Sequence, residues 1–305
     1  MASAVVLVAL TPSLAARAVD CEGTSTGRVP VTELAGAYQG AEGGLYPGGA
    51  NAPPEPHASL GMALGSLIVP RDAAGAPSSE GRIVLLTIGM SNTSIESNAL
   101  LPLAEADPAR DPGVTVVNGA KGGQAATDID DPAAAYWDHV DDRLAAANVT
   151  PAQVGAVWLK QALRRPEGTF AQEAGALRDS LRSIVVILKA RFPNLWHVYL
   201  SSRIYAGYAD TLLNPEPYAY ESAWAVKWLI AEQMTGTLPA GLVPWLAWGP
   251  YLWADGTTPR ADGLTWSCSE FKADGTHPNQ EGARKVAELI LAFLDQSPSA
   301  GWYRI

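Results

Sequence analysis

Four short runs of almost entirely apolar residues constrain the fold of this chain more than any other feature. They cover residues 83–88, 114–117, 154–159 and 195–200. An uninterrupted apolar run is typical of a parallel strand buried on both faces, because a strand with one wet face alternates apolar and polar residues. Stretches with helical spacing lie between and after them, at about 132–147, 170–191, 217–235 and 279–296. This alternation predicts an α/β protein with a parallel sheet and helices on both faces.

Composition and charge narrow the classes of partner. Apolar residues make up 48% of the 305 residues, which is ample material for a core. The formal net charge is −10, and no cluster of Lys and Arg is present. Because phosphate binding needs concentrated positive charge, we expect no nucleic acid partner. Beyond the first residues, no apolar run approaches the ~20 residues needed to cross a bilayer, so we expect no membrane span.

The first 80 residues have a different character from the rest. Residues 4–10 are apolar and residues 16–18 read Ala-Arg-Ala, so we expect a secretory signal peptide over 1–18, although its usual positive start is missing. The alternative is a buried N-terminal segment. Residues 19–80 are dense in Gly and Pro, which predicts an irregular segment that wraps a domain at 81–300.

The chain has two cysteines, Cys21 and Cys268. In an oxidising compartment they can form a disulfide that ties the mature N-terminus to the wall of the site described below. In the cytosol they are better interpreted as two unrelated buried thiols. Together with the signal peptide, they favour a secreted or periplasmic protein with a Cys21–Cys268 disulfide.

Polar residues gather where the predicted strands end. Ser91 follows the first strand, residues 118–124 the second, Lys160 and Gln161 the third, and Arg203 the fourth. In open parallel sheets, sites form beyond the carboxyl ends of the strands. We therefore expect these side chains to share one edge.

Asp274 and His277, just before the last helical stretch, complete a pattern suited to nucleophilic catalysis. A serine hydroxyl is a weak nucleophile until a positioned base takes its proton, and that base needs a carboxylate on its other nitrogen. Ser91, His277 and Asp274 supply these three groups. The alternatives are structural: Ser91 and Asn92 can cap a helix, and the Asp-x-x-His unit can be a turn.

The chain resembles the SGNH (GDSL-type) hydrolase family over roughly residues 80–297. Residues 89–92 read Gly-Met-Ser-Asn, which matches the Gly and Ser of the family's first block but has Met90 in place of Asp. Asn118 and Gly123 match the second block, and Asp-Gly-Thr-His-Pro at 274–278 matches the last block without change. The third block differs, since Leu-Lys-Gln-Ala at 159–162 lacks the usual Asn.

The resemblance implies a three-layer α/β/α fold with a flavodoxin-like parallel sheet. It also implies a serine esterase with Ser91, His277 and Asp274 as triad. Its oxyanion hole would consist of the Ser91 and Gly123 N–H groups, with the Gln161 amide in place of the missing Asn. Asn92, Lys160 and Arg203 are then candidates for substrate binding, although Arg203 can equally pair with a structural carboxylate.

The substrate is suggested by the aromatic residues. Trp and Tyr crowd residues 245–266, and exposed indoles stack well on sugar rings, although a core role is more common for any one of them. We therefore expect an acetylated glycan or a small-molecule ester as substrate, cleaved by a carbohydrate O-acetyl esterase or a short-chain esterase. The alternative is a non-catalytic glycan-binding or structural protein of the same fold. No metal-ligand motif or phosphate-binding Gly motif is present, so we expect no cofactor and no metal.

Overall fold

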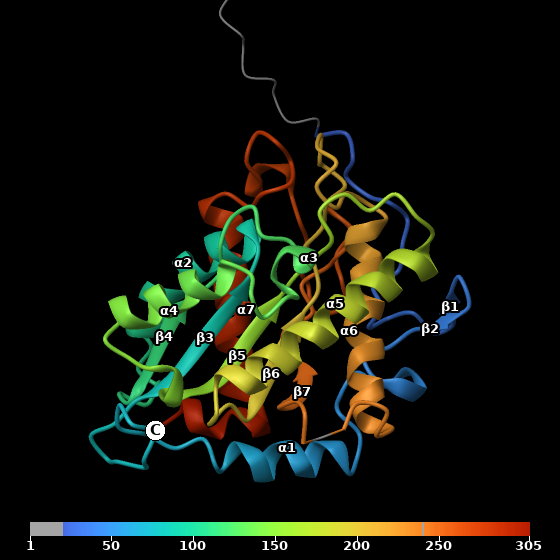
Figure 1. Ribbon diagram of the computed structural model, residues 1–305. Coiled ribbons are helices and arrows are strands. Elements are labelled where there is room, and N and C mark those ends of the chain that lie inside the picture. Colours follow the sequence, from blue (N-terminus) through green and yellow to red (C-terminus); the bar gives the residue numbers. More distant parts are fainter. Residues whose placement is uncertain (1–20, 240) are drawn as a thin grey trace, which may run out of the picture.

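The computed structural model describes residues 21–239 and 241–305, so the expected signal peptide at 1–18 lies outside the described residues. A parallel sheet forms its centre (Figure 1), with strands β3 (Ile83–Gly89), β4 (Val114–Asn118), β5 (Val154–Lys160), β6 (His197–Ser201) and β7 (Trp245–Trp248). Their order is β4-β3-β5-β6-β7. Counted along the chain this is the flavodoxin-like order 2-1-3-4-5, which confirms the predicted fold class.

The four predicted strands are confirmed to within two residues at either end. Every residue of β3, β5 and β6 is buried, as the apolar runs require. β7 is the strand of this sheet that the patterns missed. Its sequence, Trp-Leu-Ala-Trp, is also entirely buried, but it lies within the aromatic stretch that we had interpreted as a binding surface.

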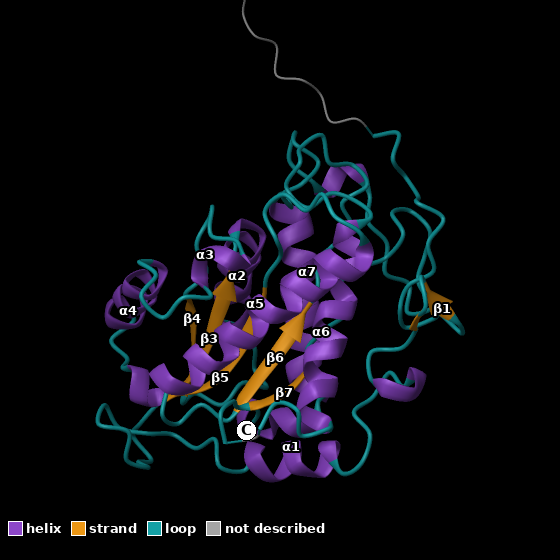
Figure 2. Cartoon of the chain, turned by 45° about the vertical axis from the view of Figure 1, so that its right-hand side comes forward, coloured by secondary structure: helices purple, strands orange, loops and turns teal. Residues whose placement is uncertain are grey.

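Helices cover both faces of the sheet (Figures 1 and 2). On one face, α2 (Ser91–Glu105) packs against α7 (Gln280–Gln296). On the other face lie α4 (Tyr136–Ala146), α5 (Phe170–Arg191) and α6 (Tyr218–Met234), with the short α3 (Ala126–Ile129) against α4 and α5. α5 buries the apolar residues whose spacing of three and four predicted it: Leu177, Leu181, Ile184, Val185 and Leu188.

The N-terminal segment contains more regular structure than its Gly and Pro content predicted. β1 (Ala37–Tyr38) and β2 (Ala41–Glu42) form a small hairpin, and α1 (His57–Gly65) lies at the amino ends of β6 and β7 (Figure 1). The expectation of irregular structure was therefore wrong for α1. Its glycines permit close packing, since a Cβ at Gly61 would lie 2.2 Å from the Trp245 ring.

The aromatic stretch at 245–266 is buried, so its interpretation as a sugar-stacking surface was wrong. Its four tryptophans are at most 4% exposed: Trp245, Trp248, Trp253 and Trp266. Two of their indole N–H groups donate to backbone carbonyls of the N-terminal segment, Trp248 to Leu45 at 2.7 Å and Trp245 to His57 at 3.1 Å. A buried indole needs such an acceptor. These residues therefore fasten the N-terminal segment to the sheet.

Cys21 and Cys268 form a disulfide, with their Cα atoms 5.5 Å apart. The residues that follow Cys21 are held by Asp255, whose carboxylate accepts the backbone N–H groups of Thr26 and Gly27 at 2.7 and 3.0 Å. The start of the described chain is thus attached to the loop that leads to Asp274. Across residues 21–239 and 241–305, no helix has the length and apolar character needed to cross a membrane.

Candidate active site

Ser91 lies at the turn between β3 and α2, beyond the carboxyl end of its strand. β3 ends at Gly89, Met90 is extended, and Ser91 is the first residue of the helix. The turn needs the glycine, because a Cβ at Gly89 would lie 2.2 Å from the Lys160 carbonyl oxygen on β5. The first N–H groups of a helix have no acceptor within it. The turn therefore presents both the Ser91 hydroxyl and its backbone N–H at the sheet edge.

The loop before α7 brings Asp274 and His277 to the same edge. The His277 Nδ1 lies 2.6 Å from Asp274 Oδ2, and its Nε2 lies 2.8 Å from Ser91 Oγ. Gly275 has φ +59°, and a Cβ there would collide with the Tyr208 carbonyl, so this tight turn needs glycine. The structure thus brings together the three residues predicted as a triad, in one line of hydrogen bonds.

The Asp274 carboxylate is held as an anion. Partial burial by itself raises its pKa, but the backbone N–H and imidazole of His277 and the N–H of Thr276 outweigh that effect and lower the pKa below its usual value. Oδ1 accepts both backbone N–H groups at 3.0 Å, which leaves Oδ2 for the imidazole. Hydrogen bonds to the charged form favour that form. Asp274 is therefore placed to orient His277 and to stabilise its protonated form.

These groups open onto a cavity of about 240 Å³. Ser91, His277 and Gly123 line it, together with apolar side chains such as Leu163 and Leu213. Gly123 has φ +74°, a backbone angle that residues with a side chain rarely adopt. The loop that carries it follows β4. The two residues that were predicted to donate backbone N–H groups to an oxyanion, Ser91 and Gly123, therefore lie on the wall of one cavity.

Gln161 does not lie where the predicted oxyanion role requires. Its side chain is 2% exposed and is not part of the cavity wall. Its amide N–H instead donates to the Gln124 carbonyl at 3.0 Å, while its Oε1 accepts the Ala162 N–H at 3.2 Å. We therefore correct its assignment: Gln161 fixes the loop that carries Gly123.

Lys160 was also predicted wrongly as a substrate-binding residue. Its side chain is completely buried, as is that of Glu96, and Nζ lies 2.5 and 2.7 Å from the two carboxylate oxygens. Burial raises the pKa of Glu96 and lowers that of Lys160, and the pair's mutual attraction opposes both shifts. This ion pair joins α2 to β5 beneath the site and does not face the cavity.

Asn92 and Arg203 do line the cavity. Asn92 is 1% exposed, and its side chain donates to the Thr276 carbonyl at 3.1 Å, so it also holds the His277 loop against α2. Sequence reasoning missed two further polar residues of the wall, Arg164 and Asn214, because they lie in long loops with no motif around them. Among the described residues, no group of three metal-ligating side chains is present.

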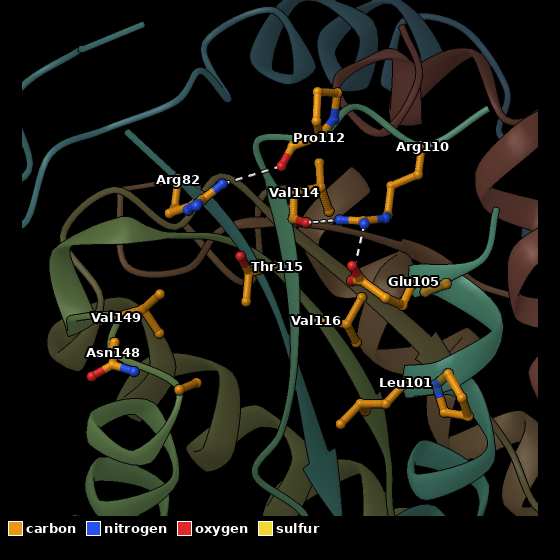
Figure 3. Close-up of a pocket in the computed structure, with 13 residues that line it drawn as sticks. Arg82, Leu101, Glu105, Arg110, Pro112, Val114, Thr115, Val116, Asn148 and Val149 are labelled. Atoms are coloured by element: carbon orange, nitrogen blue, oxygen red, sulfur yellow. Dashed lines mark hydrogen bonds and ion pairs between the residues drawn. The ribbon is translucent and has the colours of Figure 1, made fainter. Parts of the chain in front are cut away.

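A larger hollow of about 650 Å³ lies at the opposite end of the sheet, beside the start of β4 (Figure 3). Its charged side chains already have partners: Arg110 contacts Glu105 and the Val114 carbonyl, and Arg82 donates to the Pro112 carbonyl at 3.2 Å. Its wall contains no Ser, Cys or His. Size alone would favour this hollow, but the chemistry favours the smaller cavity.

No protein-family model and no curated protein matches the chain. Among solved structures, it is similar to the periplasmic domain of a lipopolysaccharide acetyltransferase from Salmonella ser. Paratyphi A, at 12% identity and a TM-score of 0.41, over 79% of this chain and 98% of that one. It is similar to an extracellular lipase from Streptomyces rimosus, at 14% identity and a TM-score of 0.37, over 69% and 99%. A Bacillus subtilis protein aligns at 14% identity and a TM-score of 0.41, over 74% of this chain but 60% of that one. Likenesses this distant carry no argument about function.

Proposed function

We propose that this chain is a serine esterase of the SGNH type that forms an acyl-enzyme on Ser91. One observation carries the proposal: Asp274, His277 and Ser91 form a continuous line of hydrogen bonds, of 2.6 and 2.8 Å, that opens onto a cavity. A helix cap or a turn would not require His277 to meet a serine 186 residues away. Nucleophile, base and orienting carboxylate in this arrangement are the requirements of acyl transfer.

The reaction begins when Ser91 Oγ attacks the ester carbonyl carbon. His277 Nε2 takes the hydroxyl proton, and Asp274 stabilises the resulting imidazolium through Nδ1. As the ester C–O bond breaks, Nε2 returns the proton to the departing alcohol. Water then attacks the acyl-serine and gives a proton to His277 Nε2. As the bond to Ser91 Oγ breaks, Nε2 returns that proton to Oγ, and the carboxylic acid leaves.

The developing oxyanion is stabilised by the N–H groups of Ser91 and Gly123. Backbone donors that are fixed in advance act where charge appears, and losing one donor typically costs about 2.7–4 kcal/mol of barrier. Since the Gln161 amide is engaged with Gln124, the proposed hole consists of two backbone donors, and Gln161 fixes the loop that carries one of them, Gly123.

The cavity favours a small acyl group. At about 240 Å³ it is smaller than the ~300–1,000 Å³ typical of sites for drug-sized ligands. Short-chain esters, including acetate esters of glycans, fit this size better than long fatty acyl esters. With the tryptophans of 245–266 buried, the glycan hypothesis rests on the polar wall of the cavity and not on aromatic stacking.

We also propose that the protein works in a secreted or periplasmic setting. The Cys21–Cys268 disulfide supports this, because disulfides persist in oxidising compartments and are rare in the cytosol.

The test is hydrolysis of p-nitrophenyl acetate together with labelling by a fluorophosphonate probe. Wild type should show both, and Ser91→Ala should lose both. Ser94→Ala, one helical turn away on α2 and half-buried, is the matched control and should keep both. A folded wild-type protein that neither hydrolyses nor labels would contradict the proposal and favour the non-catalytic alternative. Hydrolysis of aryl acetates without deacetylation of any acetylated glycan would retain the esterase and exclude the glycan substrate.

A further inference from the structure

Arg203 carries a buried positive charge with no direct partner at the wall of the cavity. It follows β6, is 2% exposed and lines the same cavity as Ser91 and His277. Its Nε and Nη2 atoms are buried and have no hydrogen-bond partner among the described residues. Its backbone N–H donates to Ser222 Oγ at 3.2 Å, which fixes its position. Buried donors without acceptors are costly and uncommon in native proteins.

The carboxylates around Arg203 are already engaged. Glu96, Glu216 and Asp274 attract its charge from a distance. Both oxygens of Glu96 contact Lys160, and Asp274 holds the imidazole and two backbone N–H groups.

Glu216, the third of these carboxylates, is fully occupied too. It accepts the Trp253 indole N–H at 2.8 Å and the backbone N–H groups of Ala206 and Tyr220 at 3.1 and 3.2 Å. Within the described chain, Nε and Nη2 of Arg203 therefore have no carboxylate to bind, although the residue lies on the cavity wall.

Asn214 adds a second unpaired polar group to the same wall. It is 5% exposed, and its Oδ1 is buried without a hydrogen-bond partner among the described residues. A guanidinium binds carboxylates well, because its parallel N–H groups match the two oxygens. A carboxamide on the wall of the same cavity can accept a hydroxyl and donate to an oxygen.

Arg164, the other arginine of the cavity wall, makes a useful contrast. It contacts Asp128 at 2.5 Å and the Gly123 carbonyl at 2.6 Å, and its side chain is 49% exposed. Its charge therefore has direct partners within the protein and is screened by solvent, whereas Nε and Nη2 of the buried Arg203 have no direct partner among the described residues.

We propose that Arg203 is a specificity-determining residue that binds a carboxylate of the substrate, so that the preferred substrates are esters carrying a negative charge near the ester bond. Asn214 binds a hydroxyl next to that carboxylate. A glycan of this kind is an O-acetylated uronic acid. Its acetyl group passes to Ser91 Oγ and then to water, which yields acetate and the free hydroxyl of the sugar acid. The inference rests on the proposed esterase function.

Net charge does not oppose this proposal. The protein is formally −10, which repels anions at long range. Such repulsion is largely screened beyond about 8 Å at physiological ionic strength. Contact with the guanidinium in the cavity is thus what decides between charged and neutral substrates.

The test compares substrates that differ only in the carboxylate. One pair is an O-acetylated methyl galacturonoside against the corresponding galactoside, which places the charge on the alcohol side. The other is monoethyl succinate against ethyl pentanoate, which places it on the acyl side. The measured quantity is the ratio of kcat/KM for charged over neutral substrate within each variant, so that a general loss of activity cancels.

In wild type, the ratio of kcat/KM for charged over neutral substrate should be about 10 to 100 for at least one pair, as a charge-assisted hydrogen bond allows. Arg203→Met should lower that ratio to about one. The ratio for Arg203→Lys should lie between those of wild type and Arg203→Met. Arg164→Met, the matched control, should keep it. The pair that responds identifies the side of the ester that carries the carboxylate. Ratios of one or less in wild type for both pairs, or an equal fall in Arg164→Met, would overturn the proposal.

A binding measurement separates this proposal from the esterase function. Galacturonate or succinate should raise the Tm of wild type, galactose should not, and Arg203→Met should abolish the shift. Hydrolysis of neutral esters with neither shift nor charge preference would leave the esterase standing and reject the anion site. An anion-specific rise in Tm in a protein that hydrolyses no ester would support the anion site and reject the esterase function.

Discussion

The chain uses the same side chain, histidine, in two ways at the two ends of one sheet. His277, beyond the carboxyl ends of the strands, lies between a carboxylate and a serine hydroxyl, and its side chain is 19% exposed. His197, at the amino end of β6, is fully buried between the Tyr199 hydroxyl at 2.9 Å and the Gly61 carbonyl at 3.0 Å. Each imidazole has two partners. A carboxylate and a cavity suit the first to proton transfer, whereas the second serves only to join α1 to the sheet.

The largest expected difference is in activity. His277→Gln should reduce kcat by about 10⁴- to 10⁶-fold, because the nucleophile loses its base. His197→Gln, the same change at the other end of the sheet, should stay within about tenfold of wild type. Hydrolysis of p-nitrophenyl acetate measures both, with circular dichroism to establish folding. Similar losses in the two folded variants would remove the distinction between the histidines.

The next effect isolates the carboxylate that distinguishes His277. Asp274→Asn should lower kcat by about 10⁴-fold, because an amide favours the wrong imidazole tautomer and does not stabilise the imidazolium. KM should change much less than kcat. Steady-state kinetics on the same ester decide, and a loss below tenfold would mean that Asp274 only shapes the turn.

The third effect is on stability and concerns His197. Burial lowers the pKa of His197 to about 4, although the Gly61 carbonyl opposes the shift. Between about pH 6.5, where histidine titrates in the unfolded chain, and pH 4, the unfolded state takes up a proton that the folded state does not. The free energy of unfolding should therefore fall by about 3 kcal/mol from this group as pH drops through that window. The measurement is urea unfolding of wild type and His197→Gln at several pH values. Between pH 6.5 and pH 4, the free energy of unfolding should fall by about 3 kcal/mol less in the variant than in wild type. Parallel curves of unfolding free energy against pH for the two proteins would contradict the prediction.

The smallest effect concerns Trp245, whose ring lies 4.8 Å from that of His197. Trp245→Phe removes the N–H donated to the His57 carbonyl and should cost about 1–2 kcal/mol of unfolding free energy. Trp196→Phe is the matched control and should cost less, since its buried N–H has no partner among the described residues. Neither should change KM for an acetylated glycan. A rise in KM for Trp245→Phe alone would revive the sugar-stacking interpretation.

The fold could be predicted where it depends on local patterns. The apolar runs at 83–88 and 154–159 determine strands because no other element buries both faces over so short a length. β7 escaped because indoles suit a binding surface as well as a core, and sequence does not say which acceptors are near. α1 escaped because its glycines look like turn residues until the contact with Trp245 is known.

The site divides in the same way. Ser91, Asp274 and His277 were found because their motifs are short and their order along the chain is informative. Lys160 and Gln161 were misassigned because their partners, Glu96 and Gln124, are 64 and 37 residues away and only the folded chain brings them together. Asn214 gave no signal at all, since a loop asparagine becomes informative only when its oxygen is buried without a partner.

The two ends of the described chain leave the molecule on opposite sides. Cys21 is bonded to Cys268 near the catalytic edge, while Ile305 donates its N–H to the Ala109 carbonyl near the far end of the sheet (Figure 1). A fusion partner or solid support joined after Ile305 would thus lie at the end of the sheet away from the cavity, whereas one joined on the N-terminal side of Cys21 would lie at the same end as the cavity. Immobilisation through the C-terminal end is accordingly the orientation in which the cavity would remain accessible to a polymeric ligand.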